Sequence, residues 1–199
     1  MGIVERKQRQ KEEVRGSILR AAWALVLAEG WQALSIRKIA DAIEYSVPVI
    51  YNHFENKEAI LLEFTREGFQ LLNAQLEEAK QKHSSPAKQL EAMAYAYWNF
   101  AFANKEYYQL MYGLGMPTCE IVRQIPEMNK FSIALQETIK ELIANSKNPH
   151  ADHFLKFHTY WSMLHGLISI NMTGRSEAPD KLNQLVLQDA IEGFIKNLE

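Results

Sequence analysis

The stretch SIRKIADAIEYSVPVIYNHFENK, residues 35–57, contains two short helical patterns separated by a turn. The first pattern repeats apolar residues at i, i+3, i+4 and i+7, which puts them on one helix face: Ile36, Ile39, Ala40 and Ile43. Ser35 and Ser46 precede the two patterns, where a serine hydroxyl can accept a hydrogen bond from a free amide of the first turn. The stretch therefore predicts a helix-turn-helix.

The second helix is expected over residues 47–54 and has two different sides. Pro48 lies in its first turn, where the missing N–H costs nothing. Ile50 and Phe54, four residues apart, form an apolar side that anchors the helix. The opposite side has the polar and aromatic character of a helix that reads the DNA major groove. Its residues are Val49, Tyr51, Asn52 and His53.

Residues 15–64, with the segments IRKIADAI, SVPVIYNHF and ENKEAIL, resemble the DNA-binding half of the TetR/AcrR family of transcriptional regulators. That family has an Ile-Ala pair, a capping Ser, a Leu/Ile-Tyr-x-His/Tyr-Phe block and a following Lys-Glu. The resemblance implies an all-α fold of about nine helices. It implies a three-helix, helix-turn-helix DNA-binding head at residues 1–56 and a ligand-binding and dimerisation domain at residues 57–199.

The turn departs from the family pattern. Glu44 and Tyr45 stand where Gly and Val are usual, so Glu44 is expected in the left-handed backbone region at a cost of roughly 1 kcal/mol. Val49 replaces the usual Thr or Ser and offers a methyl surface suited to a thymine methyl. These departures concern the operator sequence and not the fold.

Side-chain chemistry and the resemblance together give a set of expected DNA contacts. Tyr51 offers a hydroxyl to phosphate, while Asn52 and His53 have donors and acceptors that can read bases. Lys57 stands at a helix N-terminus, where both the ammonium and the free amides favour an anion. The full set is Arg37, Lys38, Val47, Pro48, Val49, Tyr51, Asn52, His53 and Lys57. An ordinary surface helix is the competing interpretation.

Length and composition fit a globular protein of one or two domains. The chain has 199 residues, of which 47% are hydrophobic and 11% aromatic. It has no apolar run near the roughly 20 residues of a membrane span, and its charged N-terminus lacks a signal-peptide core. The single cysteine, Cys119, excludes an internal disulfide framework and fits a reducing compartment. The protein is therefore expected in the cytoplasm, away from membranes.

The net charge of −2 does not by itself favour nucleic acid, but the charges are unevenly distributed. Residues 1–57 hold nine Lys and Arg against seven Asp and Glu, whereas residues 58–199 hold 13 against 17. A protein that touches DNA with one end carries this asymmetry. A charged, solvated N-terminal tail would look the same.

Helical periodicity continues on both sides of the helix-turn-helix. Before it, residues 1–12 are expected to be frayed, and a helix over residues 13–29 is expected to end at a left-handed Gly30. After it, Asn56 is expected to cap a long helix that runs to residue 83 and connects the two domains. The remaining helices are expected over residues 87–103, 107–112, 125–144, 151–173 and 179–198.

Two motifs extend the resemblance into the second domain. WSMLHG at residues 161–166 resembles the W-x-x-x-H-G motif of one TetR C-terminal subgroup, and NKEYYQLMYG at residues 104–113 resembles that subgroup's N-P-x-x-Y-x-L-M-F-x. In the family, the last two helices pair with those of a second subunit, and the wide apolar faces here fit a homodimer. The expected interface residues are Leu155, Leu164, Leu167, Ile168, Leu182, Leu185, Val186 and Phe194.

The second domain has no catalytic constellation, because paired carboxylates, a Gly-rich phosphate loop and a nucleophile elbow are all missing. Its aromatic and Met side chains, with scattered polar groups, suit an apolar ligand pocket. For any one of them, core packing is the competing interpretation. The candidates are Tyr95, Trp98, Phe102, Tyr108, Met111, Phe131, Trp161 and His165.

No metal or cofactor is expected. His150 and His153 lie close together, but the Asp152 between them is a natural helix cap. His158 and His165 share a helix face without a close carboxylate. A lone cysteine is usually inert, so oxidation sensing by Cys119 is the weaker interpretation.

The sequence thus indicates a homodimeric, sequence-specific DNA-binding regulator. Its expected partners are a pseudo-palindromic DNA operator and a small, largely apolar or aromatic effector that releases a repressor from that operator. Two alternatives stay open. One is a TetR-like DNA-binding protein without a small-molecule effector, acting structurally or through a protein partner. The other is an all-α enzyme that uses the aromatic domain as its active site.

Overall fold

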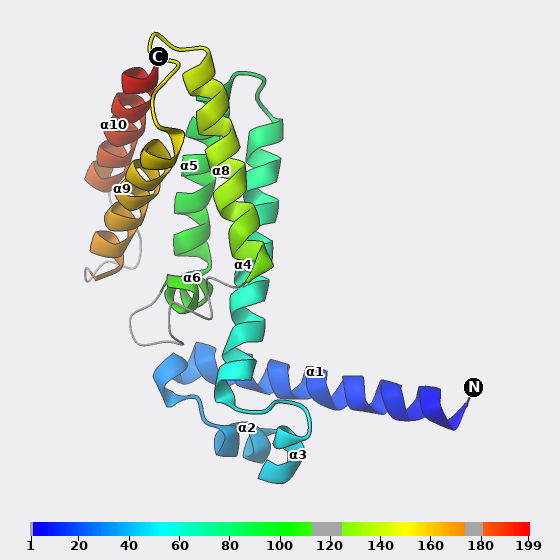
Figure 1. Ribbon diagram of the computed structural model, residues 1–199. Coiled ribbons are helices and arrows are strands. Elements are labelled where there is room, and N and C mark those ends of the chain that lie inside the picture. Colours follow the sequence, from blue (N-terminus) through cyan, green and yellow to red (C-terminus); the bar gives the residue numbers. More distant parts are fainter. Residues whose placement is uncertain (1, 113–124, 174–180) are drawn as a thin grey trace. The chain divides into compact units, whose positions relative to one another are not determined.

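The computed structural model describes residues 2–112, 125–173 and 181–199. These residues form nine α-helices and one 3-10 helix, which confirms the predicted all-α class (Figure 1). No helix in these ranges is long and apolar enough to cross a membrane. The elements are α1 (Ile3–Glu29), η1 (Trp31–Ala33), α2 (Ile36–Ala42), α3 (Val47–Tyr51), α4 (Lys57–Gln81), α5 (Pro86–Ala103), α6 (Lys105–Tyr112), α8 (Pro126–Ala144), α9 (His153–Thr173) and α10 (Lys181–Leu198).

The described chain divides into two compact units. The first contains residues 2–67 and 106–112, and the second contains residues 68–105, 125–173 and 181–199. α4 continues from the first unit into the second. These units are defined by contacts between residues, and α4 crosses from one to the other after residue 67. The boundary expected at residue 57, where α4 begins, separates two functions and stays a prediction.

The first unit is built around apolar side chains that repeat at helical spacing. Ile18, Ala22 and Val26 follow one another every four residues along α1 and are buried. α2 packs against both α1 and α3. The buried residues that α2, α3 and the following turn contribute are Ile39, Ala40, Ile50 and Phe54. The predicted apolar anchor of the second helix is therefore part of this core.

Side chains cap two of the helices as predicted. Ser35 accepts a hydrogen bond from the Lys38 amide at 3.2 Å, and Asn56 accepts one from the Ala59 amide at 2.8 Å. Ser46 is the N-cap of α3, but its side chain makes no capping bond, so this part of the prediction is wrong. Its main-chain carbonyl accepts from the Val49 amide at 2.9 Å instead. α3 ends at Tyr51, three residues earlier than predicted.

The turn between α2 and α3 has the strained backbone that the sequence predicts. Glu44 has φ 58°, and it is the one residue other than glycine with a positive φ in the described ranges. Gly30 at the end of α1 has φ 80° and ψ 168°. The positive φ is as expected, but this ψ belongs to a region open only to glycine and not to a left-handed helical cap.

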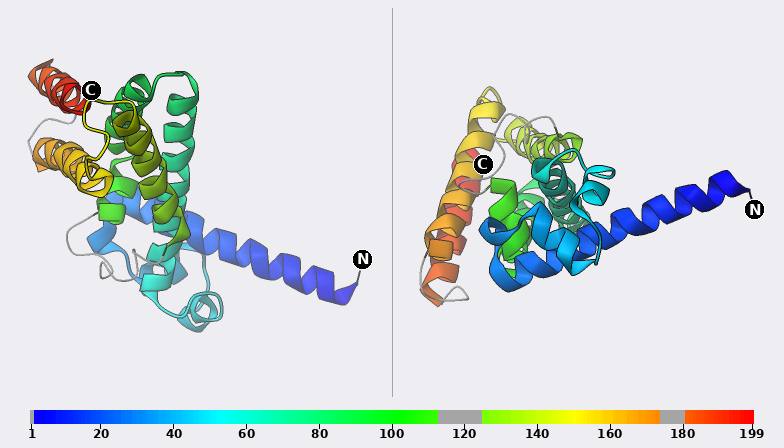
Figure 2. Two further views of the ribbon diagram at one scale, coloured as in Figure 1. Left: turned by 45° about the horizontal axis from the view of Figure 1, so that its top comes forward. Right: turned by 90° about the horizontal axis from the view of Figure 1, so that it is seen from below.

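α1 begins at Ile3, so the prediction that residues 1–12 are frayed is wrong for residues 3–12. Their side chains are exposed, and local hydrogen bonds support the helix. The Gly2 amide donates to Glu5 at 2.9 Å, and Gln8 donates to Glu12 at 2.8 Å, a favourable i, i+4 pair. This part of α1 extends beyond α2 and α3 (Figures 1 and 2).

Aromatic side chains attach α6 to the first unit. Trp23 stacks on Tyr107 with ring centroids 4.3 Å apart, and Phe64 of α4 lies 5.4 Å from Trp23. Trp31, buried as predicted, donates its indole N–H to the Glu106 carbonyl at 2.8 Å. α6 therefore packs in the first unit, although it follows α5 of the second unit directly in the chain.

The second unit is a set of packed helices in which α5 contacts α8, α9 and α10 (Figure 1). α9 and α10 also pack against each other, as Figure 2 shows. Tyr160 is fully buried and donates its hydroxyl to the Leu90 carbonyl at 2.7 Å, which joins α9 to α5. Gln70 and Asn73 of α4 both donate to Glu127, which joins α4 to α8.

We expect Glu44→Gly to stabilise the protein by a few tenths of a kcal/mol, up to about 1 kcal/mol. Glycine removes the left-handed steric cost, and the extra freedom of the unfolded glycine offsets part of this gain. Urea unfolding of the variant and of wild type measures the difference. Glu55→Gly, at a residue with negative φ, is the control and is expected to destabilise. Equal destabilisation by both substitutions would show that the turn is not strained.

Candidate nucleic-acid interface

The outer surface of α2, the turn and α3 carries most of the residues expected to contact DNA. Arg37, Pro48 and Asn52 are exposed, and Tyr51 is 50% exposed despite its large ring. Val47 and Val49 are half-buried on the same short helix. Because Ile50 is buried, Pro48, Tyr51 and Asn52 lie on the outer side of α3.

The two expected lysine contacts differ in their surroundings. Lys38 is half-buried and forms an ion pair with Glu29 at 2.5 Å, so part of its charge is already compensated. Lys57 is the first residue of α4 and forms no ion pair within the described ranges. It lies beside the free amides of the helix N-terminus, which add positive potential at that place.

His53 is more enclosed than the sequence indicates. It is half-buried, and its Nδ1 is covered by protein and makes no hydrogen bond within the described residues. Burial lowers the pKa of His53, and the nearby positive charges of Lys11 and Arg15 lower this pKa further. The imidazole is therefore neutral at pH 7, and Nε2 is the one ring nitrogen left to face a ligand.

Lys11 and Arg15 of α1 lie near His53 and Phe54, although neither is among the expected DNA contacts. The guanidinium carbon of Arg15 lies 4.9 Å from the centre of the Phe54 ring, a cation–π arrangement. Arg15 also forms an ion pair with Glu63 of α4 at 2.9 Å. The signal was in the sequence, because Lys11 and Arg15 precede Ile18 and Ala22 by seven residues and so share their helix side.

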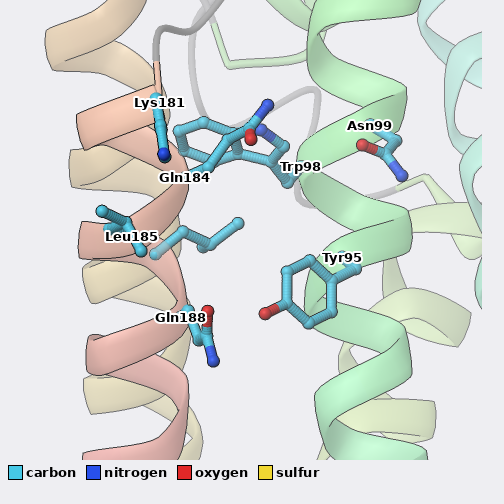
Figure 3. A pocket seen from close by; sticks show the side chains of 8 residues that line it. Tyr95, Trp98, Asn99, Lys181, Gln184, Leu185 and Gln188 are labelled. Atoms are coloured by element: carbon cyan, nitrogen blue, oxygen red, sulfur yellow. The ribbon is translucent and has the colours of Figure 1, made fainter.

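A cleft of about 430 Å³ lies between α5 and α10 in the second unit (Figure 3). Tyr95 and Trp98, both expected ligand contacts, line its α5 side together with Asn99. The α10 side is lined by Lys181, Gln184, Leu185, Leu187 and Gln188. The cleft combines an aromatic wall with amide groups and one ammonium, and its volume is within the range of small-molecule sites.

The other expected ligand contacts do not line this cleft. Phe102 packs against Trp98 at 4.9 Å, and Phe131 stacks on Tyr97 at 5.6 Å. Trp161 stacks on His165 at 5.4 Å, and burial lowers the pKa of His165. Tyr108 and Met111 are buried on α6, which belongs to the first unit. A single pocket made from all eight residues therefore stays a prediction.

The residues expected in a dimer interface fall into two groups. Four are exposed on the surface of α9 and α10: Leu155, Leu182, Leu185 and Val186. In contrast, Leu164 and Ile168 are 1% and 0% exposed in the single chain, so their side chains belong to the core and cannot reach a partner. Leu167 is half-buried, and the half-buried Phe194 packs against Tyr160 at 4.7 Å.

The histidines considered as metal ligands lie within the described ranges. Asp152 caps α9 by accepting from the amides of Phe154 and Leu155, as the sequence suggests. Within the described ranges, no three His, Cys, Asp or Glu side chains cluster as metal ligands would, and this covers His150, His153 and His158. Cys119 lies outside the described residues.

Two protein-family profiles match the chain. The profile described as "Bacterial regulatory proteins, tetR family" matches residues 18–64, and "Tetracyclin repressor-like, C-terminal domain" matches residues 90–191, which is just over half of the chain. No curated protein matches the chain at a significant level. The resemblance of residues 161–166 to the W-x-x-x-H-G subgroup stays a prediction.

Solved structures share the fold over nearly the whole chain. A protein with unknown function from Rhodococcus sp. RHA1 is 24% identical, with 92% of this chain and 94% of that chain covered and a TM-score of 0.75. FadR from Bacillus subtilis, in complex with stearoyl-CoA, is 17% identical with coverage of 89% and 97% and a TM-score of 0.68. AibR, in complex with isovaleryl coenzyme A and operator DNA, is 16% identical with coverage of 90% and 96% and a TM-score of 0.67.

The lowered pKa values of His53 and His165 predict how stability depends on pH. A histidine in the unfolded chain has a pKa of about 6.5. As the pH falls below this pKa, the unfolded chain takes up protons at these residues before the folded chain does. The free energy of unfolding should therefore decrease until the pH lies below the lowered pKa values of the folded chain. NMR titration and urea unfolding measure the two effects, and a His53→Gln/His165→Gln variant should flatten this part of the profile. Titration of either histidine above 6.5 would contradict the assignment.

Proposed function

Because the chain belongs to the tetR family of bacterial regulatory proteins, whose members are DNA-binding transcriptional regulators and not enzymes, we propose how it carries out that role. It binds a pseudo-palindromic operator as a homodimer through the outer surface of α2 and α3. It represses transcription until a small molecule bound in the second unit releases it. The observation that carries this proposal is the exposed Tyr51–Asn52 surface above a buried Ile50.

On DNA, the residues of this surface divide into two kinds of contact. Arg37, Tyr51 and Lys57 bind backbone phosphates and fix the position of α3, with a smaller contribution from the partly neutralised Lys38. Asn52 reads base edges in the major groove, and Val49 covers a thymine methyl. Val47 and Pro48 pack at the groove edge. The neutral His53 contributes one hydrogen-bonding nitrogen, Nε2, next to the phosphates.

Pairing through α9 and α10 places two heads on one DNA duplex. The exposed leucines and valine of these helices, Leu155, Leu182, Leu185 and Val186, support an apolar interface with a second copy. Leu164 and Ile168 are left out of this interface because they are buried in their own subunit. A two-fold pair must present its two α3 helices about 34 Å apart to enter successive major grooves.

The effector is a molecule with a largely apolar part, and thioesters of coenzyme A, which join an acyl group to an anionic carrier, are the class to test first. Two proteins of the same fold, FadR and AibR, hold stearoyl-CoA and isovaleryl coenzyme A in their solved structures. In this chain, the cleft between α5 and α10 offers Trp98 and two leucines to an apolar group. Lys181 offers its charge to an acidic one. To change the dimer from mostly bound to mostly released, the ligand must prefer the released state by on the order of 5 kcal/mol.

The rival without an effector is supported by one observation. Several side chains expected around a ligand, such as Phe131 and Tyr108, are packed in the cores of their units. A regulator whose core is filled would respond to a protein partner or act only through its DNA contacts. Titration of candidate ligands against the DNA complex separates the two functions.

Three substitutions on the α2–α3 surface test the proposed division of contacts. Tyr51→Phe and Lys57→Ala each remove a phosphate contact and should weaken binding about equally on the preferred sequence and on random DNA. Asn52→Ala should cost about 1–3 kcal/mol on the preferred sequence only, which relaxes specificity. The preferred duplex is first selected from a random pool. Gel-shift titration then measures the affinity of each variant for this duplex and for random DNA. Unchanged affinity of Asn52→Ala on both DNAs would refute the base-reading role.

The dimer interface is tested with a matched pair of charge substitutions. Leu182 on α10 is 65% exposed, and Leu182→Glu should produce monomers in analytical ultracentrifugation and at least a tenfold loss of DNA affinity, since about 1.4 kcal/mol corresponds to a factor of ten. Ile133 on α8 is 52% exposed outside the proposed interface, so Ile133→Glu is the control. If Leu182→Glu remains dimeric, or if Ile133→Glu dissociates the dimer instead, the proposed interface is wrong.

A further inference from the structure

The cleft between α5 and α10 has different chemistry at its two ends. α10 contributes Lys181 to one end and Gln188, seven residues later, to the other. Seven residues of an α-helix rise about 10 Å, so one small molecule can reach both ends at once. Figure 3 shows Lys181 at the end where Trp98 lies, and Tyr95 opposite Gln188 at the other end.

The Lys181 end of the cleft carries positive charge. Lys181 is exposed and forms no ion pair with another residue of the described ranges. It is the first residue of an 18-residue helix, and the helix dipole adds positive potential at that place. Gln184 and Asn99, which line the same end, offer neutral hydrogen-bond donors. This end therefore suits an anionic group such as a carboxylate.

Negative charge surrounds the Tyr95 end of the cleft. Glu192 lies one turn after Gln188 on α10 and accepts a hydrogen bond from the Gln188 amide nitrogen at 2.7 Å. Glu91 lies one turn before Tyr95 on α5 and forms an ion pair with Lys88 at 2.6 Å. Burial raises the pKa of the Tyr95 hydroxyl, and the charges of Glu91 and Glu192 raise this pKa further. The opposing effect of Lys88 is smaller, so negative charge prevails around this hydroxyl.

The polar atoms at the Tyr95 end include acceptors that an ammonium group can use. The amide nitrogen of Gln188 is turned toward Glu192, and Figure 3 shows the amide oxygen level with the Tyr95 hydroxyl. Glu192 itself forms no ion pair within the part of the chain that the structure describes. An ammonium group brings three donors and a positive charge, whereas a methyl group would leave these acceptors facing hydrocarbon.

Between its ends, the cleft is lined by hydrocarbon. Trp98 on α5 and Leu187 on α10 are buried, whereas Leu185 is 52% exposed at the surface of the cleft. A ligand segment of CH₂ groups that contacts Leu185 removes apolar surface from water and so favours binding. The middle of the ligand is therefore apolar.

We propose that the cleft binds an amphoteric small molecule, in which an apolar segment separates a carboxylate from an ammonium group. The carboxylate pairs with Lys181, and the ammonium group lies between Tyr95 and Gln188. The negative potential of Glu192 acts on that ammonium group. This inference rests on the ligand-binding role proposed above for the cleft, and it names the chemistry of both ends of the ligand. A molecule with only one of the two charged groups leaves one end of the cleft without its charged partner.

Three probes with the same eight-carbon chain test the proposal: ω-aminooctanoate, octanoate and octylamine. Each is titrated into isotope-labelled wild-type protein and followed by NMR, with the backbone amides of Gln184 and Gln188 expected among the largest shifts. We expect ω-aminooctanoate to bind about fivefold more tightly than either probe with a single charge, since each end adds a charged contact. Equal affinities of the three probes, shifts confined to other helices, or no binding of ω-aminooctanoate would overturn the proposal.

Two charge-removing variants should affect the probes in a crossed pattern. Lys181→Gln should weaken the binding of ω-aminooctanoate and octanoate about fivefold and leave octylamine unchanged. Glu192→Gln should weaken the binding of ω-aminooctanoate and octylamine and leave octanoate unchanged. Lys196→Gln and Asp189→Asn are the matched controls, because both residues are exposed on α10 and neither lines the cleft. If either charge-removing variant weakens all three probes equally, the assigned ends of the cleft are wrong.

Failure of the proposed function is recognised separately, because these titrations contain no DNA. A wild-type protein that binds no duplex would refute DNA recognition, whereas the pattern of the three probes would still decide the chemistry of the cleft. Octanoate that binds wild type as tightly as ω-aminooctanoate does would overturn the amphoteric ligand in favour of a cleft for simple acids.

Discussion

The burial of Ile50 and Phe54 is the interaction on which the proposed DNA-binding surface depends. α3 spans only Val47–Tyr51, far too few residues to be helical in isolation. It keeps its shape because Ile50 and Phe54 are enclosed with Ile39, Ala40 and Ile18 in the core of the first unit. The same burial turns Tyr51 and Asn52 outward. Packing beneath α3 therefore decides which side chains face outward. The same packing holds the turn, so the strained backbone of Glu44 is tolerated.

The first unit also includes a helix, α6, that lies in sequence between two segments of the second unit. α6 is held by the Trp23–Tyr107 stack and by the bond from Trp31 to the Glu106 carbonyl, while α5 directly before it packs with α8, α9 and α10. α4 runs through both units. The two units are therefore joined by continuous backbone at two places, within α4 and between α5 and α6.

Much of this arrangement could be predicted from the sequence because it is encoded locally. The caps at Ser35 and Asn56, the left-handed Glu44 and most helix bounds follow from residues within one turn of each feature. The polar composition of residues 3–12 favours fraying and does not reveal the helix there, although i, i+4 pairs such as Gln8–Glu12 support it. The place of Lys11 beside His53 depends on tertiary packing.

The second domain was harder to predict for a different reason. α9 is apolar on several sides, so periodicity alone could not tell the core residues Leu164 and Ile168 from the exposed Leu155. Likewise, aromatic composition indicated a pocket, but it could not show that Tyr108 packs with the head while Tyr95 and Trp98 line the cleft. Which side chains meet is decided by tertiary contacts between helices far apart in the chain.

The most direct measurement is the affinity of the wild-type protein for its selected duplex at fixed salt, with and without saturating stearoyl-CoA or isovaleryl coenzyme A. Ligand binding is followed separately by calorimetry, so that occupancy of the protein is known. We predict that the ligand releases the DNA. For a ligand that switches the protein fully, the loss of affinity is on the order of 10⁴-fold. A ligand that saturates the protein and leaves the affinity for the duplex unchanged would contradict regulation through the second unit.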